Sequence, residues 1–467
     1  MLNKPLIGKS LALKVINEAL KSGADFAELY VQSKFNHSVS LAHKRVDNCS
    51  SSLVYGASIR LMEGTKCVFG YTSDLTSASL LKLASDLASS FSSGKKLELN
   101  GFDRPLIGKP KVKIYHEEKS DEEIISYLKK GEDVIYKYSP NIVDCTCGII
   151  ESDEKVEIFN SEKKHVLDRR VRTRLVCSAV ASKDNIFQTG FEGPGGSLGL
   201  ELLDQVDYVK LAEGVAKDAV DLLSAPECPS GKMDVIIGNS FGGVLFHEAC
   251  GHPLEGTSIS HNTSVFSGKL NEKIASDVVT AIDDGTISNA WGSSAYDDEG
   301  NKTTKNVLIK DGVLVNYMVD RFDGRRMNMP STGSCRRQSY KYLPTTRMTN
   351  TYIANGKSSV EDIIKNTEFG LYCVSFSGGS VDPSTDKFNF TASKAYIVKN
   401  GKIDHLVRDA TLIGYGYEVL KNIDMVGNDL KRGQGMCGAA SGSIPVEVGQ
   451  PTLRVKNMTV GGRGGNL

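Results

Sequence analysis

The chain has 467 residues, of which 40% are hydrophobic and 24% charged, with 56 Lys plus Arg balancing 56 Asp plus Glu. This composition is typical of a folded protein of two or three domains and excludes a disordered chain. The formal net charge of zero gives no electrostatic reason to expect nucleic acid or an anionic membrane as a partner.

Targeting signals and the spacing of the cysteines indicate the cellular compartment of the protein. No apolar run is long enough for a transmembrane helix, and the first residues lack the basic and apolar regions of a signal peptide. The 10 cysteines are scattered and no CxxC motif occurs, as in buried thiols of a reducing compartment. We therefore expect a cytoplasmic protein.

Residues 1–110 are expected to form an N-terminal α/β domain. Leu11, Val15 and Ala19 recur at helical spacing, and Gly23 is the expected stop. The predicted order is a helix after Lys9, strands over 24–31, 52–61 and 67–72, and a helix from Asp74 to Leu87. This order predicts a two-layer α/β sandwich.

Residues 111–228 are expected to form a middle α/β segment that packs with the N-terminal domain. Ser120 and Glu123 have capping-box spacing and predict a helix through about Tyr138. Short strands over 142–150, 156–159 and 170–181 and a helix over 206–223 are predicted to follow. Pro226 and Pro229 mark the boundary after this segment.

Residues 229–467 are expected to form a mostly antiparallel β domain. A buried-type strand over 233–237 precedes one short helix. Asp311-Gly312, Asn355-Gly356 and Asn400-Gly401 are typical hairpin turns between β-rich runs. The predicted class is α+β: an α/β sandwich region followed by a β-rich C-terminal domain that carries the short helix.

That helix contains His247, Glu248 and His252. Two imidazoles can bind zinc, and a nearby carboxylate can take a proton from a metal-bound water whose pKa falls to about 7. The histidines are five residues apart, about 140° around a straight α-helix, so they would not converge on one ion. The helix must therefore widen into a π-turn or end between them, which Gly251 and Pro253 favour.

A chance pair of histidines on an ordinary helix stays possible, and two imidazoles do not complete a site. The third ligand is open among residues of suitable chemistry: Cys250, Glu255, His261, Asp382 and Cys437. Cys437 lies in a glycine-rich loop that could approach an ion closely, although a small residue in a tight turn would look the same.

The stretch from His247 to Gly256 resembles the HExxxH signature of the TldD/PmbA metalloprotease family. Blocks from Gly333 to Tyr352 and from Gly435 to Gly462 match the same family in the same order. The chain is therefore identified as a TldD-like, HExxxH-containing member, with the resemblance covering essentially its whole length.

The resemblance implies one zinc ion per catalytic chain, held by His247, His252 and Cys437, with Glu248 as general base. It also implies cleavage of small or unfolded peptides, including maturation of peptide precursors, by Glu-assisted attack of zinc-bound water. Family members work as dimers, so a homodimer or a heterodimer with a PmbA-like (TldE) chain is expected.

Arg336, Arg337 and Arg347 form a basic cluster near these blocks. Guanidinium groups could hold a peptide carboxylate or polarise the scissile carbonyl, so the cluster is a candidate substrate-binding site. The alternative is a structural role, in which these arginines pair with acids such as Asp320 or Asp323.

Two other functional classes stay open. The first is a non-catalytic partner or regulator, since older descriptions of the family use the label modulator of DNA gyrase. The second is a zinc amidohydrolase that acts on non-peptide substrates. The intact HExxxH motif and the neutral charge favour the peptidase over the regulator.

Overall fold

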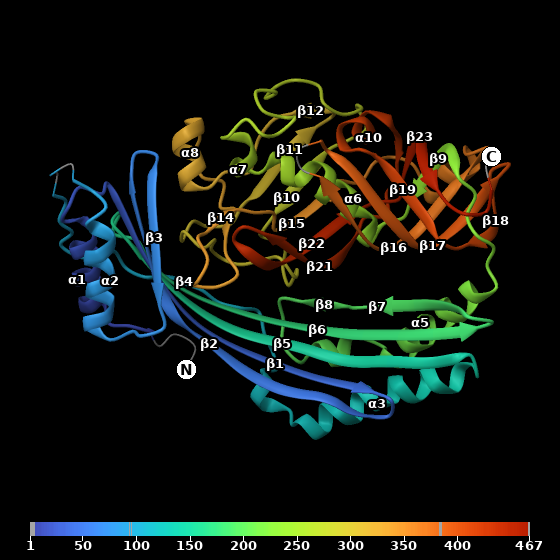
Figure 1. Cartoon of the computed structure of the whole chain (residues 1–467), viewed down its shortest axis with the longest axis horizontal. Coiled ribbons are helices and arrows are strands. Elements are labelled where there is room, and N and C mark those ends of the chain that lie inside the picture. The colour runs from blue at the N-terminus through green and yellow to red at the C-terminus, as the bar shows by residue number, and fades with distance from the viewer. Residues whose placement is uncertain (1–4, 93, 95, 383–384, 466–467) are drawn as a thin grey trace.

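The computed structural model describes residues 5–92, 94, 96–382 and 385–465. Figure 1 shows a long curved sheet with helices on one face and a block of smaller sheets over the other face. Helices and mostly antiparallel sheets confirm the predicted α+β class. Within the described part of the chain, no helix combines the length and apolar character needed to cross a membrane.

The long sheet combines strands from the first two predicted regions, in the order β3-β2-β1-β5-β6-β4, with β7 and β8 also paired to β6. Its strands are β1 (Phe26–Ala42), β2 (Arg45–Glu63), β3 (Lys66–Thr72), β4 (Leu106–Gly108), β5 (Ile142–Asn160), β6 (His165–Lys183), β7 (Ile186–Glu192) and β8 (Gly195–Gly196). Its helices are α1 (Lys9–Leu20), α2 (Ser77–Ala88), η1 (His116–Glu118), α3 (Asp121–Tyr138), α4 (Leu202–Gln205) and α5 (Tyr208–Leu223).

Two pairs of helices cover the same face of this sheet. Alternate side chains of a strand point to the same side, and the apolar residues of β1 that contact both helix pairs lie at such alternate positions. Leu29 and Val31 pack with α1 and α2, whereas Val39 and Leu41 pack with α3 and α5. The predicted capping box at the start of α3 is confirmed, since Ser120 and Glu123 bond reciprocally. The opposite face is left for the C-terminal block.

Several strands are longer than predicted. β1 continues to Ala42 and β5 runs unbroken through the two short strands expected over 142–150 and 156–159. The extension of β1 is rich in Ser, Asn and His, with apolar residues only at Phe35, Val39, Leu41 and Ala42. It stays extended because β2 and β5 pair with it along both edges.

The C-terminal block contains three sheets. A six-stranded sheet has the order β12-β11-β10-β15-β22-β21, and its strands are β10 (Ala281–Asp284), β11 (Lys305–Lys310), β12 (Val313–Leu314), β15 (Asn350–Ile353), β21 (Lys431–Ala439) and β22 (Gly442–Gln450). A second sheet joins β13 (Cys335–Arg336) and β14 (Thr345–Thr346).

The third sheet closes on itself, because β16 pairs with both β9 and β17. Its strands are β9 (Gly231–Ile237), β16 (Phe369–Asp382), β17 (Lys387–Lys399), β18 (Lys402–Val407), β19 (Ala410–Tyr415), β20 (Ile423–Val426) and β23 (Leu453–Gly461). The block's short helices are η2 (Ser240–Gly243), α6 (Val244–Phe246), η3 (His247–Gly251), η4 (His252–Leu254), α7 (Gly256–Ile259), α8 (Arg321–Met327), α9 (Val360–Lys365) and α10 (Gly416–Asn422).

Two of the three predicted hairpin turns are confirmed. Asp311-Gly312 joins β11 to β12, and Asn400-Gly401 joins β17 to β18. The prediction for Asn355-Gly356 is wrong, because this pair follows β15 and leads toward α9. There the Gly356 N–H donates to the Gly427 carbonyl at 2.7 Å, so a distant segment takes the place of a hairpin partner.

Buried ion pairs join the long sheet to the C-terminal block. Arg60 lies 2.9 Å from Glu28 on the neighbouring strand and 2.7 Å from Glu299 of the block. Arg337 of the block in turn lies 2.7 Å from Glu28. All four side chains are almost fully buried, so loss of one partner would leave an uncompensated charge in the interior.

Glu151 is a buried carboxyl whose charge opposes folding. It is 4% exposed, its Oε2 has no hydrogen-bond partner within the described structure, and burial, together with the charge of Asp121, raises its pKa to about 7. The folded protein therefore holds a proton that the unfolded chain, with a pKa of about 4.3, releases earlier. Stability attributable to Glu151 falls as pH rises between these two values.

We expect Glu151→Gln to raise the unfolding free energy at pH 8 by about 1–3 kcal/mol and to have little effect at pH 4. Denaturant melts of both proteins at several pH values provide the measurement. Glu213→Gln, on an exposed position of α5, is the control. Parallel pH profiles for wild type and Glu151→Gln would contradict the assignment.

Candidate metal centre

The helix that carries both histidines changes its pitch between them. Residues His247–Gly251 form a π-helix, and the His252 N–H donates to the His247 carbonyl five residues earlier. A 3₁₀ turn with Pro253 follows at once. The predicted widening is confirmed, and it brings the two rings to 5.1 Å between centroids.

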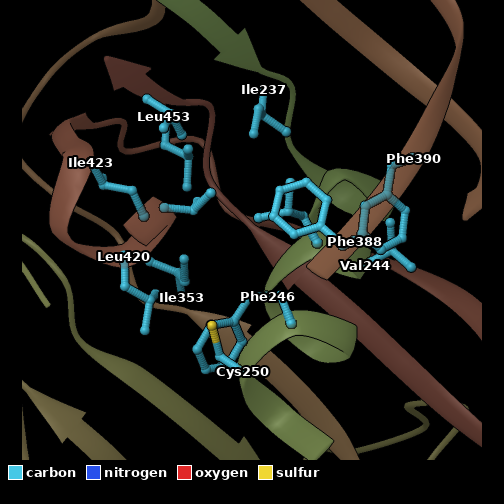
Figure 2. Packing of buried hydrophobic residues seen from close by; sticks show 14 of the residues in the cluster. Ile237, Val244, Phe246, Cys250, Ile353, Phe388, Phe390, Leu420, Ile423 and Leu453 are labelled. Atoms are coloured by element: carbon cyan, nitrogen blue, oxygen red, sulfur yellow. The ribbon is translucent and has the colours of Figure 1, made fainter. Parts of the chain in front are cut away.

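Apolar packing fixes the other side of this helix. Phe246 and Cys250 are buried in the core cluster that also contains Ile353 and Phe388 (Figure 2). Gly251 is required by a close approach, since a Cβ there would lie 2.2 Å from the sulfur of Met348. The helix is thus held by the core on one face while its histidines project from another.

Cys437 reaches the histidines from the hairpin of β21 and β22. Its Sγ lies 3.3 Å from His247 Nε2 and 3.1 Å from His252 Nε2. All three donor atoms lie within 4.8 Å of one another. A tetrahedral zinc ion, with bonds of about 2.0–2.3 Å, separates such ligand atoms by about 3.3–3.6 Å. The geometry and the N₂S donor set therefore fit zinc.

The other candidate third ligands lie elsewhere. Cys250 is buried in the core, with its Sγ 3.8 Å from the Gly416 carbonyl. His261 is exposed, with its Nε2 2.7 Å from Arg326. Asp382 is at the end of β16 and does not belong to the cluster of His, Cys and carboxylate donors found among the described residues.

Glu255 touches the site without entering the cluster. Its Oε2 is 3.1 Å from Nδ1 of His252, and its Oε1 accepts a hydrogen bond from the Met348 N–H. A carboxylate on the far nitrogen of a metal-binding imidazole fixes the ring orientation and raises its basicity. The sequence marked Glu255 only as a possible ligand, because its contact with His252 depends on the turn after Pro253.

Burial and neighbouring charges set the protonation states. Burial lowers the pKa of His247 well below its usual value, so its imidazole is neutral, as a metal ligand must be. Burial also lowers the pKa of His252, but Glu255 and Cys437 outweigh this effect and hold it well above the usual value.

Glu248 stands beside the three donors. Its Oε2 is 3.8 Å from Nε2 of His252, and 27% of its side chain is exposed. Burial raises the pKa of this carboxyl, which favours proton uptake. This position suits a general base that accepts a proton from a molecule bound at the site without itself binding the metal.

The three candidate substrate arginines are buried, and the terminal nitrogens of their guanidinium groups donate to described groups of the protein. Arg336 donates to the carbonyls of Met348 and Pro445, and Arg337 to Glu28 and the Asp298 carbonyl. Neither Asp320 nor Asp323, the expected structural partners, is among these contacts.

Arg347 acts on the hairpin that carries the thiol. It donates to the carbonyls of Cys437 at 2.6 Å and Gly442 at 2.9 Å and to the Ser441 hydroxyl at 2.9 Å. Sequence reasoning also missed Trp291, whose indole N–H donates to the Gly435 carbonyl at 3.0 Å. No local motif marks these contacts, since each joins segments far apart in the chain.

Three family models match the chain in order. They are the PmbA/TldA metallopeptidase domain 1 over residues 27–90, the central domain over residues 114–223 and the C-terminal domain over residues 230–462.

Curated relatives are similar over nearly their full length. The chain is 34% identical to a metalloprotease TldD homolog of Buchnera aphidicola subsp. Schizaphis graminum, covering 99% of this chain and 98% of that protein. It is 35% identical to the corresponding homolog of Haemophilus influenzae, covering 94% and 93%. A zinc metalloprotease TldD homolog of Saccharolobus solfataricus is 26% identical over 96% and 99%.

Two solved structures share the fold. A putative modulator of a DNA gyrase from Thermotoga maritima matches with a TM-score of 0.79 and 20% identity, over 97% of this chain and 99% of that one. TldE from Thermococcus kodakarensis matches with a TM-score of 0.74 and 20% identity, over 96% and 99%.

If Glu255 orients His252, its removal should weaken metal binding. We expect Glu255→Ala to lower zinc affinity by about 10- to 100-fold and Glu255→Gln, which keeps an acceptor, to lower it less. Competition with a chromophoric chelator measures the affinity, and Glu272→Ala, at an exposed position, is the control. Wild-type affinity in Glu255→Ala would show that the contact does not support the metal.

Proposed function

The chain belongs to the TldD/PmbA family of metallopeptidases, and we propose that it is a zinc-dependent peptidase that cleaves small or unfolded peptides. The observation that carries the proposal is the convergence of His247, His252 and Cys437, with Glu248 beside them. An imidazole and thiolate donor set is typical of zinc, which supports one zinc ion per chain.

A zinc ion held by these ligands would supply a Lewis acid for the scissile carbonyl and for water. The chain's own contribution is proton transfer by Glu248, whose Oε2 faces the ligand side of His252. This carboxylate takes the proton of the attacking water and returns it to the leaving amine. Glu255 and Arg347 keep the ligands in place during the reaction.

The edge of the six-stranded sheet supports a peptide substrate. β21 is an edge strand. Ala439 and Gly442 are the last pair before the hairpin turn, so every second residue of β21, counted back from Ala439, exchanges hydrogen bonds with β22. Met436 and Gly438 should then turn their N–H and C=O groups outward on either side of Cys437. Pro445, which has no N–H, lies opposite Met436, in agreement with this alternation. A peptide can therefore add to β21 as a further strand.

The intact ligand set favours catalysis over a silent regulatory role. The fold shared with a putative gyrase modulator does not decide the question, because the same fold can carry different functions. A substrate panel of peptides and simple amides distinguishes the proposed peptidase from an amidohydrolase for non-peptide substrates. The cysteines are all unpaired, which supports our proposal of a cytoplasmic location.

We expect wild type to bind one zinc ion per chain and to digest unstructured peptides. Glu248→Ala should keep the zinc and lose about 100- to 10,000-fold in turnover, because only proton transfer is removed. His247→Ala should lose both metal and activity. Elemental analysis and mass spectrometry of the digests measure these outcomes.

Glu213→Ala, which removes an exposed glutamate from α5, is the matched control for Glu248→Ala and should behave as wild type. Near-normal turnover by Glu248→Ala would contradict the base role and make Glu255 the next candidate. Wild type that digests peptides without bound metal would contradict the zinc proposal.

We also propose a dimer in which each active site opens onto a cavity shared between subunits. The fold shared with a TldE structure supports a TldE-like chain as one possible mate, and a second copy of this chain is the other. Light scattering should give twice the 50.5 kDa chain mass for the protein alone, or the summed mass of both chains with a co-expressed TldE-like chain. A strict monomer that digests peptides at full rate would exclude the dimer as the working form.

A further inference from the structure

Arg174 lies where the long sheet meets the ligand strand. It belongs to β6, and its Nε donates to the Gly193 carbonyl at 3.0 Å. Its Nη2 donates to the carbonyl of Gln434 on β21 at 3.2 Å. The guanidinium group therefore sits at the edge of the strand that carries Cys437.

Within the described parts of the chain, no acid forms an ion pair with this guanidinium group. Arg60, Arg170 and Arg337 each have a carboxylate within 3 Å, whereas no ion pair of Arg174 occurs among the described residues. Arg172 and Arg336 also bond only to carbonyls, but both are buried, whereas Arg174 is partly exposed. Burial lowers the pKa of Arg174, and no neighbouring acid offsets the effect. A half-buried cation without a counter-ion favours an anionic ligand.

Part of the guanidinium group is available to such a ligand. Within the described structure, Nη1 of Arg174 has no hydrogen-bond partner, and it is not among the buried unpaired atoms. Arginine has five N–H donors, of which the two carbonyls occupy two. The free donors match the fork geometry of a carboxylate.

Two glycines and an exposed aromatic surface adjoin the Arg174 side chain. Built Cβ atoms at Gly193 and Gly195 would lie 2.8 Å and 2.9 Å from its side chain, so these glycines give it space to lie along the sheet. The same position at Gly193 is 3.2 Å from the ring of Phe191, which is 56% exposed. Phe187, on the same face of β7, is 63% exposed. An exposed aromatic surface thus adjoins the free guanidinium donors.

The spacing along β21 relates Arg174 to the metal centre. Gln434 and Cys437 are three residues apart on one strand, a separation of about 10 Å. A peptide that adds antiparallel to β21 would have its scissile carbonyl near Cys437 and its C-terminal side toward Gln434. Two to three residues beyond the scissile bond would then reach Arg174.

We propose that Arg174 binds a carboxylate of the peptide substrate, two to three residues beyond the scissile bond. The carboxylate is either the C-terminus of the peptide or an acidic side chain at that position. This inference rests on the proposed peptidase function and assigns to Arg174 the role that the sequence suggested for Arg336, Arg337 and Arg347.

Binding to the zinc-loaded Glu248→Ala protein tests the proposal without turnover. The probes are one fluorescent eight-residue peptide with uncharged side chains, as free acid and as C-terminal amide, and a set of amides with Glu or Gln at each position. Fluorescence anisotropy gives each Kd. Wild type with the same peptides, followed by mass spectrometry, locates the cleaved bonds.

We expect the free acid, or one Glu-containing amide, to bind about 10- to 100-fold more tightly than its uncharged counterpart. Cleavage should fall two to three residues before the preferred carboxylate. Adding Arg174→Gln should abolish this preference, and Arg174→Lys should keep part of it. Arg45→Gln, at an exposed position of β2, should keep all of it.

Equal Kd values for all acid and amide peptides would overturn the proposal. The proposal would also be overturned if Arg174→Gln weakened the binding of acid and amide peptides equally, because that result would mean that Arg174 only holds β21 in place. Carboxylate-dependent binding without cleavage by wild type would contradict the peptidase function and leave the carboxylate site standing. Cleavage by wild type without a carboxylate preference would support the peptidase function and contradict the carboxylate site.

Discussion

The proposed metal centre depends on one contact, between the imidazole of His252 and the thiol of Cys437, residues 185 positions apart. Closing so long a loop is entropically costly, and a strand at the edge of a sheet has no second neighbour to hold it. Side-chain donors reinforce its pairing with β22. Trp291 and Arg347 bind the carbonyls of Gly435 and Cys437, so the thiol is positioned before any ligand arrives.

The long sheet contributes to the site although it supplies no metal ligand. Buried ion pairs such as Arg60 with Glu299 fix its register against the C-terminal block, and Arg174 extends from it to β21. Loss of either partner of a buried ion pair leaves an uncompensated charge in the interior. This junction therefore resists small shifts of the long sheet relative to the C-terminal block. The sheet can therefore act as one wall of a peptide site whose chemistry lies in the block.

Features fixed by local geometry could be predicted from the sequence. The five-residue spacing of His247 and His252 demanded a wider turn, and the capping residues of α3 marked its start. Cys437 could be singled out from five candidates only by family resemblance, because no spacing rule links it to the histidines. The polar half of β1 was missed, since its extended form depends on the strands that flank it.

The arginines show why residue type alone did not identify function. An interior arginine paired with a carboxylate, such as Arg337, joins two bodies and has little charge left for a ligand. One whose donors meet backbone carbonyls, such as Arg347, holds a strand in place. Arg174 shares the carbonyl contacts but keeps free donors and lacks an acid. Its burial without a counter-ion is a cost that a bound carboxylate would relieve, and the sequence cannot show which arginine keeps donors open to a ligand.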